Sequence, residues 1–242
     1  FGCACCPSNV SRFIPSLPGY VYAVKDNQVY VNLYLSNKAE LIINKKKVVL
    51  EQETGYPWNG DIRVKVAQGN QEFALKLRIP GWVRNEVLPS DLYSYADNQK
   101  PTYRIIVNGQ ETANTLNNGY LSIERKWKKG DVVKIHFDML PRIVKANEKV
   151  VDDKGRVSVE RGPIVYCAEW PDNKCNVHTV LLNQHPQFKV VEKPELLYGI
   201  SQLKTDAQAL SYDKNGKLIT KDTELTLIPY YAWAHRGEGD ME

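Results

Sequence analysis

The chain has 242 residues, 43% of them hydrophobic and 25% charged, which is an ordinary composition for a folded globular protein long enough for one large or two ordinary domains. Its net charge of +4 is small beside 32 Lys and Arg and 28 Asp and Glu residues, which argues against nucleic acid or an anionic membrane as a partner. No apolar stretch approaches the length of a membrane span, and the odd number of cysteines, five, argues against a disulfide framework while leaving the compartment open.

The first feature along the chain is a dense group of cysteines, Cys3, Cys5 and Cys6. Thiolates are preferred zinc ligands, and a thiolate is also the strongest ordinary side-chain nucleophile. The C-x-C-C spacing differs from the familiar C-x-x-C pattern, and a structural zinc site needs four protein ligands. The residues alone leave metal ligation and plain buried or disulfide-bonded cysteines as open interpretations. Because the chain starts without Met, inside this motif, we expect it to be the downstream part of a longer protein.

The following sequence predicts many short β-strands. Apolar and polar residues alternate with a period of two, which puts one face of each strand in a core and the other in water. A lysine-rich turn at 45–47 separates two such segments and predicts a hairpin, and Asn108-Gly109 predicts another. The alternating segments are 28–36, 40–44, 47–53, 62–66, 73–79, 103–107, 120–123 and 133–137. Many short strands separated by turn residues predict an all-β protein with antiparallel, jelly-roll-like β-sandwiches.

Polar, turn-rich sequence between Pro141 and Asp153 predicts a domain boundary. We expect a first β-sandwich domain at residues 19–145 and a second at 146–242. Within the second, the apolar spacing of 195–203 is compatible with one short helix.

Histidines and tryptophans offer weaker site candidates. His136 alternates with Ile135 and Phe137, so we expect an exposed strand histidine, and His178 has the same character. None of the four histidines has the paired spacing of a metal site. Five tryptophans could stack on sugar rings, but packing at the core edge or between domains is the favoured interpretation, particularly for Trp82 and Trp127 at strand ends. The five are Trp58, Trp82, Trp127, Trp170 and Trp233.

Blocks along almost the whole chain carry a family resemblance. They are Cys5-Cys6-Pro7 with Asn9 and Arg12, Val31-Asn32-Leu33-Tyr34, Thr54-Gly55-Tyr56-Pro57-Trp58-Asn59-Gly60, Leu77-Arg78-Ile79-Pro80-Gly81-Trp82, Gly119-Tyr120-Leu121, Arg125-Lys126-Trp127, Glu160-Arg161-Gly162-Pro163-Ile164-Val165-Tyr166 and the segment 228–237. In this order they resemble the β-L-arabinofuranosidase glycoside hydrolases, a family long catalogued as a domain of unknown function. The resemblance implies a helical (α/α) barrel that carries the active site, followed by β-sandwich domains. Residues 1–18 would then be the last edge of that barrel.

The same resemblance implies roles for the cysteines. Cys5 and Cys6 would be zinc ligands and Cys5 also the nucleophile of a retaining hydrolysis, whereas Cys3 matches no ligand position and is interpreted as structural. The other ligands, a Glu and a Cys, and the acid that protonates the leaving group would come from the missing N-terminal barrel. The expected partners are this barrel, which the sandwiches would brace, and an arabinose-containing or related plant glycan. The alternative is an autonomous carbohydrate-binding or structural β-sandwich module.

Overall fold

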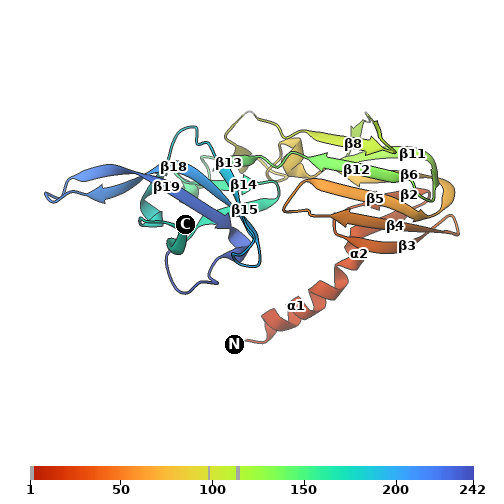
Figure 1. Ribbon diagram of the computed structural model, residues 1–242, viewed down its shortest axis with the longest axis horizontal. Helices are drawn as coiled ribbons and strands as arrows, with labels where there is room; N and C mark the ends of the chain where they lie inside the picture. The colour runs from red at the N-terminus through yellow and green to blue at the C-terminus, as the bar shows by residue number, and fades with distance from the viewer. Residues whose placement is uncertain (1–2, 98, 113–114) are drawn as a thin grey trace. The chain divides into compact units, whose positions relative to one another are not determined.

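The computed structural model describes residues 3–97, 99–112 and 115–242, which form two compact units (Figure 1). The first unit comprises Phe1–Asn85 and Lys100–Asp138, and the second comprises Glu86–Gln99 and Met139–Glu242. Strands dominate both units, which confirms the expected all-β class. In the part of the chain that the structure describes, no helix has the length and apolar character needed to cross a membrane.

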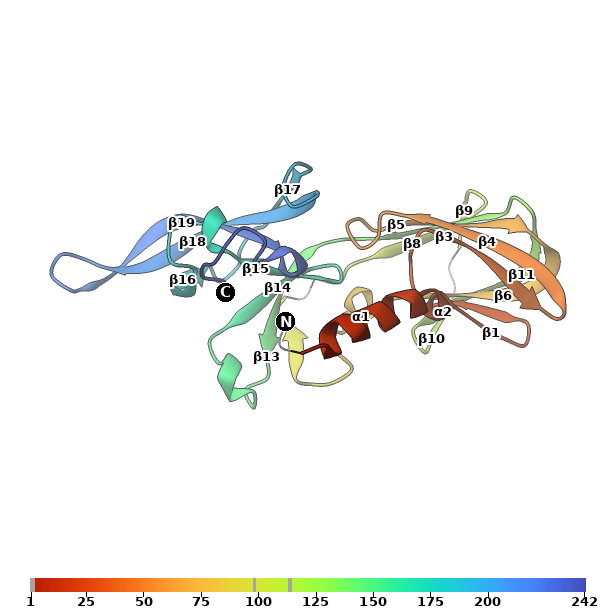
Figure 2. The ribbon, with the colours of Figure 1, turned by 90° about the horizontal axis from the view of Figure 1, so that it is seen from below.

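The first unit begins with two consecutive helices, α1 (Cys5–Ser16) and α2 (Pro18–Val21). Pro18 starts α2, a position where its missing N–H costs nothing. α1, whose path is drawn in Figure 2, has no buried residue. Its apolar residues Val10, Phe13 and Ile14 are all more than half exposed. A helix of this length is marginal in water without packing. Burial within the described residues therefore contributes little to the stability of α1.

Two sheets form the body of the first unit. The five-stranded sheet has the order β1 (Tyr22–Lys25), β2 (Gln28–Val31), β6 (Asn70–Arg78), β11 (Tyr120–Lys128), β10 (Leu116–Asn117). The six-stranded sheet has the order β3 (Asn37–Ile43), β4 (Lys46–Thr54), β5 (Asp61–Gln68), β12 (Val132–Phe137), β8 (Tyr103–Val107), β9 (Gln110–Glu111). All pairings in both sheets are antiparallel except β2 with β6, which is parallel. A short 3₁₀ helix, η1 (Gly81–Arg84), follows β6.

The core of the first unit follows the predicted alternation. In β12, Val133, Ile135 and Phe137 are buried, whereas His136 is exposed. The indole N–H of the fully buried Trp127 donates to the backbone carbonyl of Phe73 at 3.0 Å, so a large apolar group is buried without an orphan donor. Core packing is thereby confirmed for Trp127, and Trp82 is also buried.

Both predicted hairpins of this unit are present. The β3–β4 turn has Asn44 and Lys45 at φ 48° and 64°, and the β8–β9 turn has Asn108 and Gly109 at φ 50° and 87°. Two successive residues with positive φ match the twist of antiparallel strands, and Asn and Gly adopt that conformation at least cost. The lysine-rich segment is an exposed hairpin tip, as expected.

The second unit is built on one eight-stranded sheet. Its order is β16 (Val180–Leu182), β18 (Ile200–Tyr212), β19 (Leu218–Pro229), β15 (Ile164–Ala168), β14 (Val157–Arg161), β13 (Pro141–Ala146), β7 (Tyr93–Tyr95), with β17 (Lys189–Lys193) also paired to β18. The long β18–β19 hairpin is clear in Figure 1. Buried side chains of this hairpin, including Leu203 and Leu227, form a core with those of neighbouring segments, including Tyr166 and Val177. Short 3₁₀ helices lie between or after the strands: η2 (Val151–Asp153), η3 (Trp170–Asp172), η4 (Val177–Thr179) and, after β19, η5 (Tyr230–Ala232).

Two details differ from the sequence-based expectations. Segments 86–99 and 139–145, expected in the domain 19–145, lie in the second unit, because β7 and β14 pair with the two edges of β13. The prediction of a short helix at 195–203 is wrong. Leu197, Tyr198 and Gly199 all have positive φ, which ends any helical path, and β18 starts at Ile200.

Candidate functional site

The cysteine group lies at the N-terminus of α1. Cys5 and Cys6 are the first two residues of the helix, and Cys3 lies just before it. The Cys3 and Cys5 sulfurs are 2.9 Å apart, and the Cys5 and Cys6 sulfurs are 3.7 Å apart. All three thiols are free, and none is buried by the described residues.

Local sequence explains how the helix presents these thiols. Pro7 is tolerated because it lies in the first turn, where its N–H would have no helical partner. The hydroxyl of Ser8 donates to the carbonyl of Cys5 at 3.0 Å, and that of Ser11 donates to the carbonyl of Pro7 at 2.8 Å. No side chain caps the helix and no acidic residue occupies its first turn. The backbone N–H groups of the first turn are thus without a side-chain cap, and this end of a helix favours negative charge.

The distances between the three sulfurs can be compared with the sulfur–sulfur distances in a tetrahedral zinc site. A tetrahedral site with Zn–S bonds of about 2.3 Å places neighbouring sulfurs about 3.8 Å apart. The 3.7 Å separation of Cys5 and Cys6 matches one such edge, whereas the 2.9 Å separation of Cys3 and Cys5 is too short for it. Among the described residues, no group of three or more His, Cys, Asp and Glu side chains is arranged to hold a metal ion. Cys5 and Cys6 thus fit a zinc ion as two of its ligands, and the chain offers no described third.

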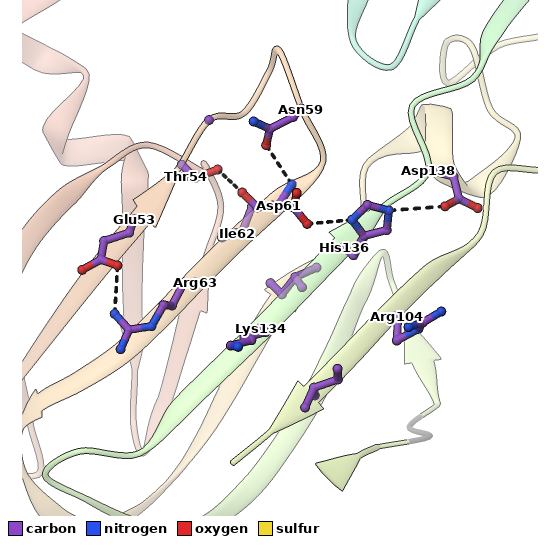
Figure 3. A pocket seen from close by; sticks show the side chains of 13 residues that line it. Glu53, Thr54, Asn59, Asp61, Ile62, Arg63, Arg104, Lys134, His136 and Asp138 are labelled. Atoms are coloured by element: carbon purple, nitrogen blue, oxygen red, sulfur yellow. Dashed lines mark hydrogen bonds and ion pairs between the residues drawn. The ribbon is translucent and has the colours of Figure 1, made fainter. Parts of the chain in front are cut away.

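A second polar site lies on the exposed face of the six-stranded sheet. It is an open groove of about 730 Å³ over β5, β12 and β8 (Figure 3). Its lining is polar apart from three isoleucines and a glycine: Glu53, Thr54, Gly55, Asn59, Asp61, Ile62, Arg63, Arg104, Ile106, Lys134, Ile135, His136 and Asp138.

His136 is central to one end of this groove. Its Nδ1 lies 2.7 Å from Asp61 Oδ1, and its Nε2 lies 3.5 Å from Asp138 Oδ1 (Figure 3). The hydroxyl and backbone N–H of Thr102 both donate to Asp138. These hydrogen bonds, more than the nearby His136, lower the pKa of Asp138 against the opposing effect of burial.

The other end of the groove is more basic. Arg63 donates to Glu53 at 2.9 Å, while Lys134 has no ion-pair partner in the part of the chain that is described. Sequence reasoning missed this groove. Period-two alternation could place each of these side chains on an exposed face, but it does not say which strands become neighbours, and three separate segments contribute.

Among the described residues, the histidines and tryptophans that the sequence offered as site candidates do not gather in one place. His136 is confirmed as an exposed strand histidine, but His178 is not on a strand: it lies in η4, with its Nδ1 2.9 Å from Glu242. Trp58 and Trp170 are exposed, and Trp233 stacks on Tyr230 with a centroid distance of 6.0 Å. Among the described residues, the tryptophans thus form no shared platform within either unit, and Trp82 and Trp127 belong to the core.

The second unit holds a nearly buried ion cluster. Arg236 pairs with Glu169 and Asp172, whose side chains are 3% and 10% exposed. Both carboxylates raise the pKa of Arg236, with the hydrogen bond to Asp172 the largest cause. Glu169 also accepts from the backbone N–H of Ala234 at 2.7 Å. Because these charges satisfy one another, the cluster fixes the C-terminal segment against β15 and is not a reactive site.

Comparisons with known proteins find matches that together extend over the whole chain. Residues 28–139 match the model of the middle domain of family 127 β-L-arabinofuranosidases, and residues 141–242 match that of the family 127 C-terminal domain. A curated relative, the non-reducing end β-L-arabinofuranosidase of Bifidobacterium longum subsp. longum, is 30% identical over the full chain, which covers 36% of that protein.

Solved structures give the same result. A family 127 β-arabinofuranosidase is 80% identical with a TM-score of 0.98, and the chain covers 38% of it. A family 127 β-L-arabinofuranosidase from Geobacillus stearothermophilus T6 is 33% identical with a TM-score of 0.86, and the chain covers 37% of it. In both comparisons the match extends over 100% of this chain. The chain therefore spans little more than a third of the length of the relatives it matches.

Proposed function

This chain belongs to glycoside hydrolase family 127, and on that basis we propose that it is the C-terminal, β-rich portion of a retaining glycoside hydrolase of the β-L-arabinofuranosidase type. Relatives that bear this name extend well beyond the matched region, which supports an active site completed by sequence outside these 242 residues. The substrate class we propose is an arabinose-containing or related plant glycan.

The observation that carries the proposal is the exposed Cys5–Cys6 pair with its 3.7 Å sulfur separation. Both cysteines would hold a zinc ion, which when bound keeps its sulfur ligands deprotonated at neutral pH. The two side chains sit at a helix end that favours negative charge, with no described group covering them. Cys3, which precedes the helix, is not assigned a ligand role.

In the chemical step, Cys5 acts as nucleophile. Its thiolate sulfur forms a bond to the anomeric carbon while the bond from that carbon to the leaving oxygen breaks. The leaving oxygen takes a proton from a carboxylic acid supplied by the rest of the protein. Water then displaces the sulfur, giving its proton to the same carboxylate, and two inversions give net retention.

The remainder of the chain would brace the catalytic domain. The apolar side of α1, with Val10, Phe13 and Ile14 exposed, supports this role because such a stripe normally packs against another element. We propose the protein's own N-terminal helical barrel as the element that covers it.

An activity assay tests the proposed function. The 242-residue chain and a longer protein that includes its upstream sequence are each incubated with an aryl β-L-arabinofuranoside. The longer protein should release the aryl group and the chain alone should not, because the chain has no credible acid–base partner beside Cys5 among its described residues. Turnover by the chain alone, or none by the longer protein with zinc supplied, contradicts the proposal.

A further inference from the structure

The groove on the six-stranded sheet has a regular construction that the cysteine chemistry does not use. Strand register places Asp61, His136 and Arg104 opposite one another on β5, β12 and β8. A second row, two residues along, is formed by Glu53, Arg63, Lys134 and Ile106 on β4, β5, β12 and β8. Cross-strand neighbours on one face lie about 5 Å apart and the rows about 7 Å apart. The side chains therefore form two rows on one face of the sheet, and all of them except Ile106 are polar (Figure 3).

One pairing in these two rows is unfavourable for the fold alone. Arg63 and Lys134 are register partners on neighbouring strands, and like charges directly opposite each other destabilise a sheet. Arg63 is compensated by Glu53, but Lys134 has no ion-pair partner among the described residues. This ammonium group, at the basic end of the groove and without an ion-pair partner among the described residues, is available to donate to a ligand.

Other polar groups of the groove are held in place before any ligand arrives. His136 is fixed between Asp61 and Asp138, and Thr102 fixes Asp138 from outside the groove. The side chain of Asn59 accepts from the backbone N–H of Asp61 at 3.0 Å. Binding to groups that are already ordered costs little conformational entropy, which distinguishes this surface from ordinary flexible surface charges.

The chemistry of the lining selects the ligand class. The carboxylates Glu53, Asp61 and Asp138 are balanced by three cations, Arg63, Arg104 and Lys134. This balance disfavours phosphates and polyanions, while closely interleaved donors and acceptors suit hydroxyl groups, which both donate and accept. A volume of about 730 Å³ lies within the usual range for small-molecule sites.

We propose that this groove is a second carbohydrate site, which binds a neutral oligosaccharide of a few sugar units by hydrogen bonds and without an aromatic platform. The proposed function contributes only the expectation that the protein meets glycans. The site itself rests on the register, the charge balance and the free ammonium group. It would hold a polysaccharide chain near the enzyme without taking part in the cleavage step.

Calorimetric titration of the 242-residue chain tests the proposal, with arabinotriose as the neutral probe and trigalacturonate as an acidic probe. Arabinotriose should bind with a Kd that changes little between low and high salt. Lys134→Ala and His136→Ala should each weaken binding about tenfold. Lys38→Ala is the matched control: Lys38 is an exposed lysine on the same sheet, paired with Glu51 outside the groove, and its loss should leave the Kd unchanged.

The outcomes separate this proposal from the hydrolase assignment. Cys5→Ser should bind arabinotriose normally, since the groove lacks cysteines, so binding can succeed even where catalysis by the longer protein fails. Circular dichroism confirms that each variant remains folded. Absence of arabinotriose binding, equal binding by Lys134→Ala and Lys38→Ala, loss of binding in Cys5→Ser, or tighter, salt-dependent binding of trigalacturonate overturns the proposal.

Discussion

The sulfurs of Cys5 and Cys6 lie 3.7 Å apart although the two residues are adjacent on a helix. Neighbouring helical side chains normally diverge by about 100° around the axis. Both residues occupy the first turn of α1, where no preceding turn of the helix restricts their side chains. The 3.7 Å separation keeps both sulfurs within reach of one ion.

Substitutions of Cys5 and Cys6 in the longer protein should reduce its activity for different reasons. Either Cys→Ala change should lower zinc content, measured by inductively coupled plasma mass spectrometry. Cys5→Ser retains an oxygen that can ligate but loses the polarizable sulfur that attacks carbon in the proposed mechanism, so kcat should fall at least about a thousandfold even with zinc bound. Cys6→Ser should lose activity mainly through zinc, and added zinc should restore part of it.

A mechanism-based sugar label locates the nucleophile independently. After digestion, the label should be found by peptide sequencing on Cys5. A label on Cys6 or Cys3, or full activity of zinc-loaded Cys5→Ser, would show that the assignment is wrong.

Thiol exposure predicts two reactivity classes in the 242-residue chain. Cys3, Cys5 and Cys6 are exposed, whereas Cys167 is only 4% exposed. With an aromatic disulfide reagent at about pH 8, these three exposed thiols should react within the fast phase, and Cys167 should react only on unfolding. Mass spectrometry of the partly modified protein identifies which cysteines carry the label. Fast labelling of Cys167 would contradict the buried position on β15.

The buried thiol should also affect stability at high pH. Burial, more than the nearby Glu169 and Asp172, raises the pKa of Cys167 from 9.0 to about 11. The unfolded chain therefore loses this proton at lower pH than the folded chain, so the thiol's contribution is fully present below pH 9 and is lost as pH rises to about 11. A shift of this size corresponds to at most about 3 kcal/mol.

Urea unfolding at four pH values from about 8 to about 11 measures this contribution. Wild type should lose more stability over this pH range than Cys167→Ala, because only wild type has the Cys167 thiol. All other groups that titrate at alkaline pH are common to both proteins. Cys175→Ala, which removes a partly exposed thiol, serves as control and should follow wild type. Parallel curves for wild type and Cys167→Ala would exclude the effect.

The strands of this protein were easier to predict than its sites. The alternation around Ile135 and the turn chemistry at Asn108-Gly109 are local, so sequence alone identified the all-β class and the hairpins. The helix predicted at 195–203 shows where apolar spacing alone is insufficient. The leucines of this segment do pack on the core, but they belong to a left-handed turn and the start of a strand.

The groove shows the corresponding limit for function. Asp61 and His136 are 75 positions apart in sequence, and only the β5–β12 pairing brings them together. No composition or spacing rule encodes that neighbour relation. The three cysteines at the N-terminus of α1, by contrast, are nearly contiguous in the chain, so their spacing alone was enough to mark them as a candidate site.

A single glycine links the fold to the groove. A Cβ at Gly60 would lie 1.9 Å from the backbone carbonyl oxygen of Phe137, an atom that cannot turn away as a side chain could. The same two residues are joined by a 3.0 Å hydrogen bond from the N–H of Phe137 to the carbonyl of Gly60. Gly60→Ala should therefore push β5 from β12 and destabilise the protein by about 1–3 kcal/mol.

Gly19→Ala is the control, because a Cβ there meets nothing within 4 Å. Alanine is the better helix former, so this change in α2 should be neutral or slightly stabilising. Urea midpoints at neutral pH compare the two variants. Since Asp61 directly follows Gly60 and contacts His136, Gly60→Ala should also weaken arabinotriose binding under conditions where the protein is still folded. A Gly60→Ala protein as stable as Gly19→Ala would contradict the close β5–β12 contact.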